Sequence, residues 1–130
     1  MSERLYQKLL AWQQAHRLCL FVYNLTKKFP KDEHWRLVDQ IARAVGSVPA
    51  NIAEGNTRRS LKEKRRYFEI ALASLEEVHY HGFLAKDLAY ISHDDFQKLD
   101  QQIQSIGYLL TKLRASLVIR KLPPSISPIH

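Results

Sequence analysis

An apolar residue recurs every three or four positions through the last third of the chain. The set consists of Phe96, Leu99, Ile103, Ile106, Leu110, Leu113 and Leu117. Because an α-helix turns once every 3.6 residues, this spacing places the whole set on one face of a single helix. An unbroken stripe of this kind is typical of a coiled-coil seam or an antiparallel helical bundle. It therefore predicts that other apolar helices cover it.

The segment before Pro30 has two neighbouring apolar edges at helical spacing. One edge is Leu5, Leu9, Trp12, His16, Cys19 and Tyr23, and the other is Leu18, Phe21 and Leu25. A face of this width indicates a helix that is buried on two sides, against the bundle and against another subunit. Pro30 ends this helix, because proline cannot continue it.

The next helix is predicted to begin near Glu33 and to stop at Gly55. Its apolar positions are Val38, Ile41, Val45, Val48 and Ile52. Pro49 lies inside this pattern, and a proline removes one i→i−4 hydrogen bond and crowds the carbonyl four residues earlier. The pattern continues beyond the proline. We therefore predict a helix that is kinked at Pro49.

The remaining boundaries follow from capping signals. Ser60 and Glu63 have the spacing of a capping box, which predicts a third helix from Leu61 to about Ala89. Ser92 and Asp95 start the last helix in the same way. Four long amphipathic helices joined by short links predict an all-α, up-down-up-down antiparallel four-helix bundle. With 130 residues and 45% hydrophobic content, one domain over 5–118 is expected, and the Pro-rich residues 119–130 are predicted to be a disordered tail.

Positive charge is concentrated between the second and third helices. The chain carries a formal net charge of +7. Between residues 58 and 66 there is one carboxylate, Glu63, and six cations: Arg58, Arg59, Lys62, Lys64, Arg65 and Arg66. Two interpretations remain open. The cations form either a solvated face that neighbouring acidic residues balance, or a surface that contacts nucleic-acid phosphates without reading bases.

A polar stripe follows the proline-containing helix and comprises Arg43, Ser47, Asn51 and Glu54. It has no convincing nucleophile–base pair and no glycine-rich phosphate loop. We therefore interpret it as a structural polar network and not as a catalytic site. Arg43 is expected to pair with Glu54 or with Glu77 of the third helix. The other two side chains are expected to satisfy backbone groups that Pro49 frees.

The sequence predicts no metal site, no cofactor and no membrane-spanning helix. Glu76-x-x-His79 matches one half of a di-iron motif, but the second such pair that the site requires is missing. Cys19 is the only cysteine, which excludes an internal disulfide. No apolar run approaches the roughly 18 residues that a span needs, and the N-terminus lacks the form of a signal peptide. We expect a cytoplasmic protein that is not an enzyme.

Several motifs in the chain are specific enough to indicate a family. The most specific is the run Ser47-Val48-Pro49-Ala50-Asn51-Ile52-Ala53-Glu54-Gly55. It is supported by Trp12-Gln13-x-Ala15-His16, Phe29-Pro30-Lys31, Ala71-x-x-Ser74-Leu75-x-Glu77 and Ala85-Lys86-Asp87-Leu88-x-Tyr90-Ile91-Ser92. Together these motifs resemble a bacterial four-helix-bundle family encoded in intervening sequences of 23S ribosomal RNA genes, and the resemblance covers about residues 9 to 118. Ala42 departs from the pattern, because a second arginine is common at that position.

The resemblance implies a homopentamer with a central channel. A related branch, the accessory variability determinant of diversity-generating retroelements, is a basic pentamer that binds nucleic acid and a reverse transcriptase. We therefore expect a non-enzymatic oligomer that binds RNA or DNA through its phosphates, using the six cations between residues 58 and 66. The alternative is a protein-interaction scaffold, such as a reverse-transcriptase accessory protein.

Overall fold

The computed structural model describes residues 4–117, and these residues form helices and no strand. The α-helices are α1 (Leu10–Leu25), α2 (Leu37–Thr57), α3 (Leu61–Asp87) and α4 (His93–Ala115). Short 3-10 helices precede α1 (η1, Leu5–Lys8) and lie between α1 and α2 (η2, Thr26–Lys28; η3, Lys31–Glu33). The all-α prediction is confirmed. The predicted tail, residues 119–130, lies outside the described residues.

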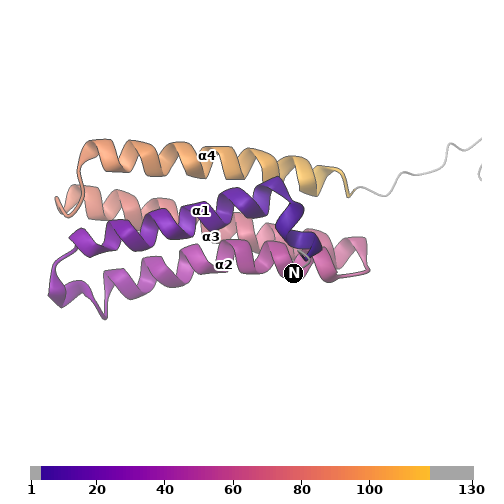
Figure 1. Cartoon of the computed structure of the whole chain (residues 1–130), viewed down its shortest axis with the longest axis horizontal. Coiled ribbons are helices and arrows are strands. Elements are labelled where there is room, and N and C mark those ends of the chain that lie inside the picture. Colours follow the sequence, from indigo (N-terminus) through magenta and orange to yellow (C-terminus); the bar gives the residue numbers. More distant parts are fainter. Residues whose placement is uncertain (1–3, 118–130) are drawn as a thin grey trace, which may run out of the picture.

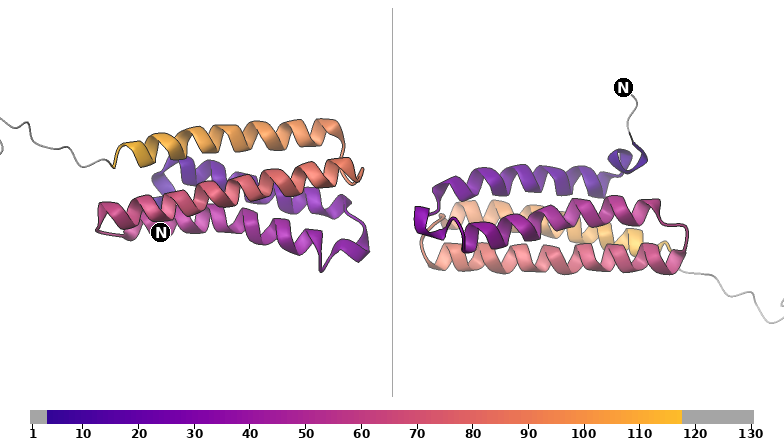
Figure 2. Two further views of the ribbon diagram at one scale, coloured as in Figure 1. Left: turned by 180° about the vertical axis from the view of Figure 1, so that it is seen from behind. Right: turned by 90° about the horizontal axis from the view of Figure 1, so that it is seen from below.

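Successive α-helices lie side by side and alternate in direction (Figures 1 and 2). Helix α1 packs against α2 and α4, and α3 packs against the same two helices. The α1–α2 connection and the start of α4 therefore share one end of the bundle. The α2–α3 turn, η1 and the end of α4 share the other end, which we call the α2–α3 end (Figure 1).

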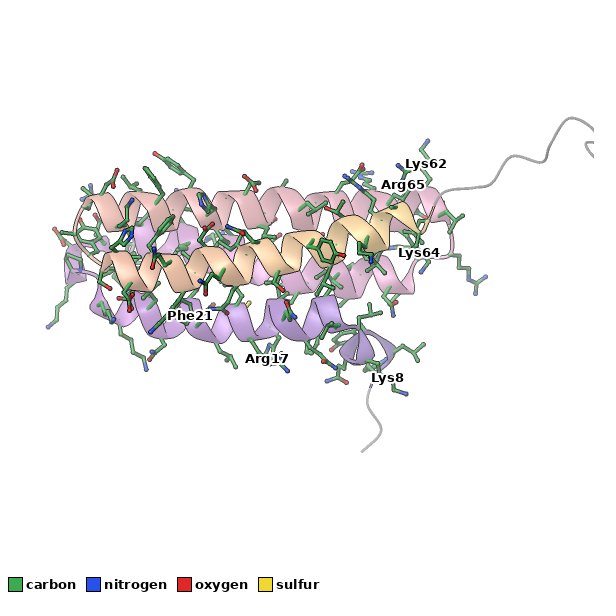
Figure 3. The ribbon with its side chains drawn as sticks, turned by 90° about the horizontal axis from the view of Figure 1, so that it is seen from above. Lys8, Arg17, Phe21, Lys62, Lys64 and Arg65 are labelled. Carbon is green, nitrogen blue, oxygen red and sulfur yellow. The ribbon has the colours of Figure 1, made fainter. Side chains whose placement is uncertain are left out.

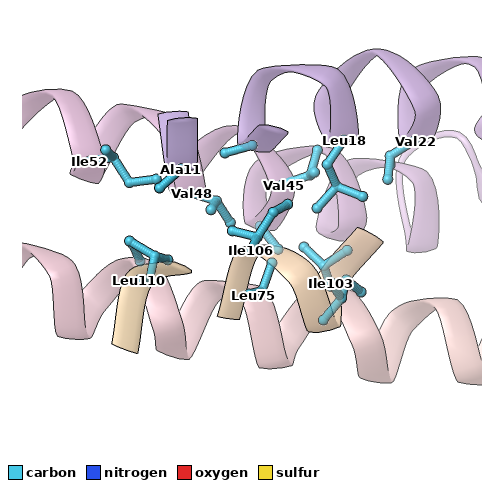
Figure 4. Packing of buried hydrophobic residues seen from close by; sticks show 14 of the residues in the cluster. Ala11, Leu18, Val22, Val45, Val48, Ile52, Leu75, Ile103, Ile106 and Leu110 are labelled. Carbon is cyan, nitrogen blue, oxygen red and sulfur yellow. The ribbon is translucent and has the colours of Figure 1, made fainter. Parts of the chain in front are cut away.

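All four α-helices contribute side chains to one continuous core (Figure 4). The stripe predicted on α4 faces it. Four members of that stripe are buried, and the other three are partly buried against the same core: Leu99, Ile103, Ile106 and Leu110, then Phe96, Leu113 and Leu117. The prediction succeeds because a regular three-and-four spacing over six turns defines a single apolar face, and only that face can turn towards the core.

On α1 the second predicted edge faces the core and the first mostly does not. Leu18 and Leu25 of the second edge are buried together with Ala11, Ala15 and Val22, whereas Leu5, His16 and Tyr23 of the first edge are exposed. His16 stacks on Trp12 outside the core, with ring centroids 5.1 Å apart. The two small alanines let α1 approach its neighbours closely, so they face inward while the larger residues stay near the surface. The sequence pattern gave more weight to the large side chains.

Helix α2 begins at Leu37 and not near Glu33, because Lys31–Glu33 forms a separate 3-10 turn. The helix then continues through Pro49 without a break, and it ends at Thr57 and not at the predicted stop, Gly55. A bend at Pro49 remains a prediction. Pro49 has no N–H, so the carbonyl of Val45 lacks its usual helical donor. The thiol of Cys19 on α1 donates to this carbonyl oxygen instead, at 3.2 Å.

The α3–α4 connection is fixed by caps at both helix ends. Ala89 adopts a left-handed conformation (φ 62°), and the N–H groups of Ala89 and Tyr90 donate to the carbonyls of Lys86 and Ala85. This is the Schellman arrangement. Ser92 then caps α4 reciprocally with Asp95. A second buried cluster closes this end of the bundle, formed by Leu25, Phe29, Leu37, Ala85 and Ile91.

Candidate nucleic-acid interface

The α2–α3 turn is short and rigidly placed. Only three residues, Arg58 to Ser60, separate the two helices. The Ser60 hydroxyl accepts from the N–H of Glu63 at 3.2 Å, which caps α3. Gly55 brings the helices together, because a Cβ there would lie 2.8 Å from a ring carbon of Phe68. The cations of the turn are therefore held on well-defined backbone.

Arg58 is engaged within the protein. Its Nη2 donates to Glu54 Oε2 at 2.7 Å and to the Tyr67 hydroxyl at 3.0 Å. The guanidinium carbon also lies 4.8 Å from the centroid of the Tyr67 ring. The hydrogen bond that Arg58 donates to Glu54 raises the pKa of Arg58 above its ordinary value. These contacts hold Arg58 against the turn and reduce what it offers to a ligand.

Lys64 is also engaged. Its Nζ donates to the carbonyl oxygens of Asn56 at 3.0 Å and of Gly55 at 3.3 Å. Both carbonyls belong to the last turn of α2, where the helix leaves acceptors unpaired and its dipole favours a cation. Lys64 therefore caps α2 across the turn, although the sequence analysis assigned it to nucleic-acid binding.

The other four predicted cations face solvent. Arg59, Lys62, Arg65 and Arg66 are exposed, and none forms an ion pair within residues 4–117. Lys62 and Arg65 project outward from α3 at the α2–α3 end (Figure 3). We call these four residues the free basic cluster. Arg59 precedes α3, and the other three lie in its first two turns, near an N-terminus whose dipole adds positive potential.

The fold brings further charge to the α2–α3 end that the sequence analysis missed. Among the described residues, Arg4 with η1, residues 54–69 and the last turns of α4 together hold ten cations and three carboxylates at this end. The cations outside the predicted set are Arg4, Lys8, Lys112 and Arg114, and the carboxylates are Glu54, Glu63 and Glu69. Arg114 lies 3.8 Å from Glu69, which places the end of α4 beside the start of α3. Only the antiparallel packing of the helices reveals this grouping.

The opposite end is electrically balanced. Its six cations are Lys27, Lys28, Lys31, Arg36, Lys86 and Lys98, and its six carboxylates are Asp32, Glu33, Asp39, Asp87, Asp94 and Asp95. Several are paired, the closest being Lys28 with Asp95 at 2.7 Å. Tyr90 donates to Glu33 at 2.6 Å, and this hydrogen bond lowers the pKa of Glu33. The positive charge of the described chain is therefore concentrated at the α2–α3 end.

The predicted polar network is not one network. Arg43 donates to Asp39 at 3.0 Å and contacts neither Glu54 nor Glu77, so the expected pairing is wrong. Arg43 points into solvent, with 80% of its side chain exposed, and an acceptor one turn away on the same helix is closest. Glu54 pairs with Arg58 and Glu77 with His81, at 2.7 and 3.3 Å.

Ser47 and Asn51 do form a small interhelical unit. Asn51 Nδ2 donates to both the carbonyl oxygen and the hydroxyl of Ser47, each at 2.8 Å. Ser74 Oγ on α3 donates to Ser47 Oγ at 2.8 Å. Neither side chain is hydrogen-bonded to the Val45 carbonyl that Pro49 frees, so this part of the prediction is wrong; Cys19 donates to that carbonyl instead. Their polar groups instead link α2 to α3.

Two searches of residues 4–117 bear on other kinds of site. No three His, Cys, Asp or Glu side chains in that range are grouped closely enough to hold a metal ion. Likewise, no helix there combines the length and the apolar character that crossing a membrane requires.

Comparison with known proteins identifies the family. Residues 7–112 match the profile of the 23S rRNA-intervening sequence protein family. A crystal structure of a protein of unknown function from the S23 ribosomal protein family of Bacteroides thetaiotaomicron VPI-5482 superposes with a TM-score of 0.75. The two sequences are 22% identical over 81% of this chain and 98% of the other. None of the curated proteins matches the chain. The family profile spans most of the bundle, so the chain belongs to the 23S rRNA-intervening sequence protein family.

Proposed function

We propose that this protein binds RNA, or DNA with the same chemistry, through phosphate contacts at the α2–α3 end. The observation that carries the proposal is the free basic cluster, four exposed cations with no ion pair within the described residues. Phosphate contacts of this kind supply affinity without base readout. The family name, which refers to a segment of ribosomal RNA genes, favours RNA as the first probe.

The proposed role is binding, with no chemical step. We also propose that the chain self-assembles, as a pentamer by analogy with the family. A ring would place several free basic clusters on one particle, and linked binding sites raise the overall affinity for a long polyanion. The alternative function, a scaffold for a reverse transcriptase or another protein, is favoured by exposed apolar side chains of α1 such as Leu20 (61% exposed).

The first experiment replaces Arg59, Lys62, Arg65 and Arg66 with glutamine. Binding to a labelled mixed-sequence RNA would be followed by fluorescence anisotropy between about 50 and 200 mM salt, the range over which phosphate contacts weaken strongly. The log–log salt slope should fall in magnitude by up to about 3, at roughly 0.7 per lost contact with a single strand.

The matched control removes the same charge elsewhere. Arg17, Lys27, Lys31 and Lys98 are exposed and carry no ion pair in the described range, so glutamine at these four positions changes the net charge equally. This variant should retain most of the affinity. Equal losses in the two variants would mean that net charge alone attracts RNA, and absence of binding by the parent protein at low salt would refute the proposal. Partners captured after nuclease treatment would favour the scaffold.

A further inference from the structure

A groove of about 610 Å³ opens between the end of α1 and the start of α2, away from the basic end. Its floor and walls are mainly aromatic and apolar, with Tyr23, Phe29, Trp35 and Val38 among the contributors, and Lys27 and Lys31 also line it. Trp35 is 83% exposed and Tyr23 57% exposed. We call this feature the Trp35 groove. Exposed aromatic side chains around a groove are a common feature of binding sites.

The chain itself contains a segment of matching chemistry. Residues 122–130 read Leu-Pro-Pro-Ser-Ile-Ser-Pro-Ile-His. In the polyproline II conformation, which has three residues per turn, Pro123, Ile126 and Ile129 would share one edge of the segment. Proline-rich segments bind aromatic-lined grooves by this conformation, and they lose little entropy in doing so. We propose that residues 122–129 of one copy of the chain dock in the Trp35 groove of a second copy.

The distances exclude docking within a single copy. Residue 117 follows the end of α4, whereas the Trp35 groove is at the opposite end of the bundle (Figure 1). The 23 residues of α4 span about 34 Å at helical rise. Residues 118–121, which would have to cover this length, extend at most about 14 Å. If the groove of a second copy lies near the end of α4 of the first copy, residues 118–121 do not have to bridge the length of the bundle.

This arrangement joins opposite ends of neighbouring chains. Such a contact is heterologous, and it generates a ring when the rotation between copies closes. The inference thus deepens the proposed self-assembly and is independent of RNA binding.

The test measures docking directly with a fluorescein-labelled peptide of residues 120–130. The receptor is the full chain carrying Ile126→Asp and Ile129→Asp, so that its own segment does not compete. Adding Trp35→Ala to this receptor should weaken peptide binding by about tenfold or more, because a tryptophan in a groove is a typical hot spot. Adding Tyr108→Ala, at another exposed aromatic (62% exposed) on α4, should leave it unchanged. Equal peptide binding to the Trp35→Ala and unmodified receptors, or no binding to either, overturns the proposal.

Sedimentation velocity then shows whether docking joins copies. The Trp35→Ala chain keeps its segment, and the Ile126→Asp/Ile129→Asp chain keeps its groove. Each alone should associate more weakly than the parent, and mixing the two should recover a mixed complex. Oligomers that are unchanged in every variant, together with failure of the peptide to bind, overturn the docking and leave self-assembly through another surface. Binding of a short RNA that a single free basic cluster can fill should match the parent in both variants, because neither substitution touches that cluster; a long RNA should bind more weakly as assembly is lost.

Discussion

The thiol of Cys19 donates to the carbonyl oxygen of Val45 at 3.2 Å. Val45 lies four residues before Pro49, so its carbonyl is the one that the proline deprives of a helical partner. A buried carbonyl without a donor is costly, and a side chain from α1 removes that cost. Cys19 thus has a structural role that complements the proline of α2.

A double-mutant cycle tests this relationship. Cys19→Ala should lower the free energy of unfolding by about 1–2 kcal/mol, because it leaves the Val45 carbonyl unpaired. In a Pro49→Ala background, residue 49 regains its N–H, and the same substitution should cost about 0.5–1 kcal/mol less. Urea unfolding of the four proteins measures the difference. Equal costs in the two backgrounds would show that the thiol does not compensate for the proline.

The pH dependence of alkylation provides a second test. Burial raises the pKa of Cys19 to about 11, so the thiol stays protonated and able to donate at neutral pH. Iodoacetamide should react roughly three-hundredfold more slowly at pH 7.5 than with a free cysteine, whose pKa is about 8.5. Because the folded pKa exceeds the unfolded one, the thiol stabilises the fold below about pH 9, and this contribution falls as pH rises towards 11. Cys19→Ala should lose this part of the alkaline sensitivity, and rapid labelling of the folded parent would contradict the assignment.

Ala89 occupies a position that favours glycine. Its φ of 62° lies in the left-handed region, at the residue that completes the Schellman cap of α3. Ala89→Gly should therefore raise the free energy of unfolding by about 1 kcal/mol. Ala85→Gly, at a fully buried helical position one turn earlier, should lower it. A thermal unfolding scan of both variants gives the comparison, and destabilisation by Ala89→Gly would be inconsistent with the cap.

Two helical glycines should respond to alanine in opposite directions. A Cβ at Gly82 would overlap the side chain of Leu99, which is fully buried and cannot move freely, so Gly82→Ala should cost about 1–3 kcal/mol. A Cβ at Gly46 meets no atom within 4 Å, so Gly46→Ala should stabilise α2 by about 0.5–1 kcal/mol. Urea midpoints distinguish the two variants. If the overlap is the cause, Gly82→Ala should cost less free energy of unfolding in a Leu99→Ala background than in the parent.

The six predicted cations should separate into structural and exposed classes. Arg58→Gln and Lys64→Gln remove contacts to Glu54, Tyr67 and the last carbonyls of α2, and each should lower the urea midpoint. Arg59→Gln and Arg65→Gln should leave the midpoint unchanged, because these side chains contact solvent. The same four variants, titrated with RNA, should show the larger salt-dependent losses for Arg59 and Arg65. Uniform effects on stability would contradict the division.

How much of the buried face can be predicted from the sequence depends on how many helix faces an apolar pattern is compatible with. The regular stripe of α4 is compatible with one face, and its buried positions were predicted correctly. Helix α1 has two apolar edges, and the choice between them depends on how closely α2 and α4 approach Ala11 and Ala15. The partners of Arg43 and Cys19 depend on distances between side chains, which periodicity does not contain.

The sequence by itself determined that the chain forms four amphipathic helices, that the last two begin after Ser60 and Ser92, and that six cations lie beside one turn. Local hydrogen bonding and the 3.6-residue period are sufficient for these features. Only the tertiary structure decided which of the cations remain free. Lys64 reaches the α2 carbonyls because α2 and α3 meet at Gly55, and Arg114 joins the basic end because α4 runs antiparallel to α3. These contacts connect residues whose spacing in the chain does not specify their distance in space.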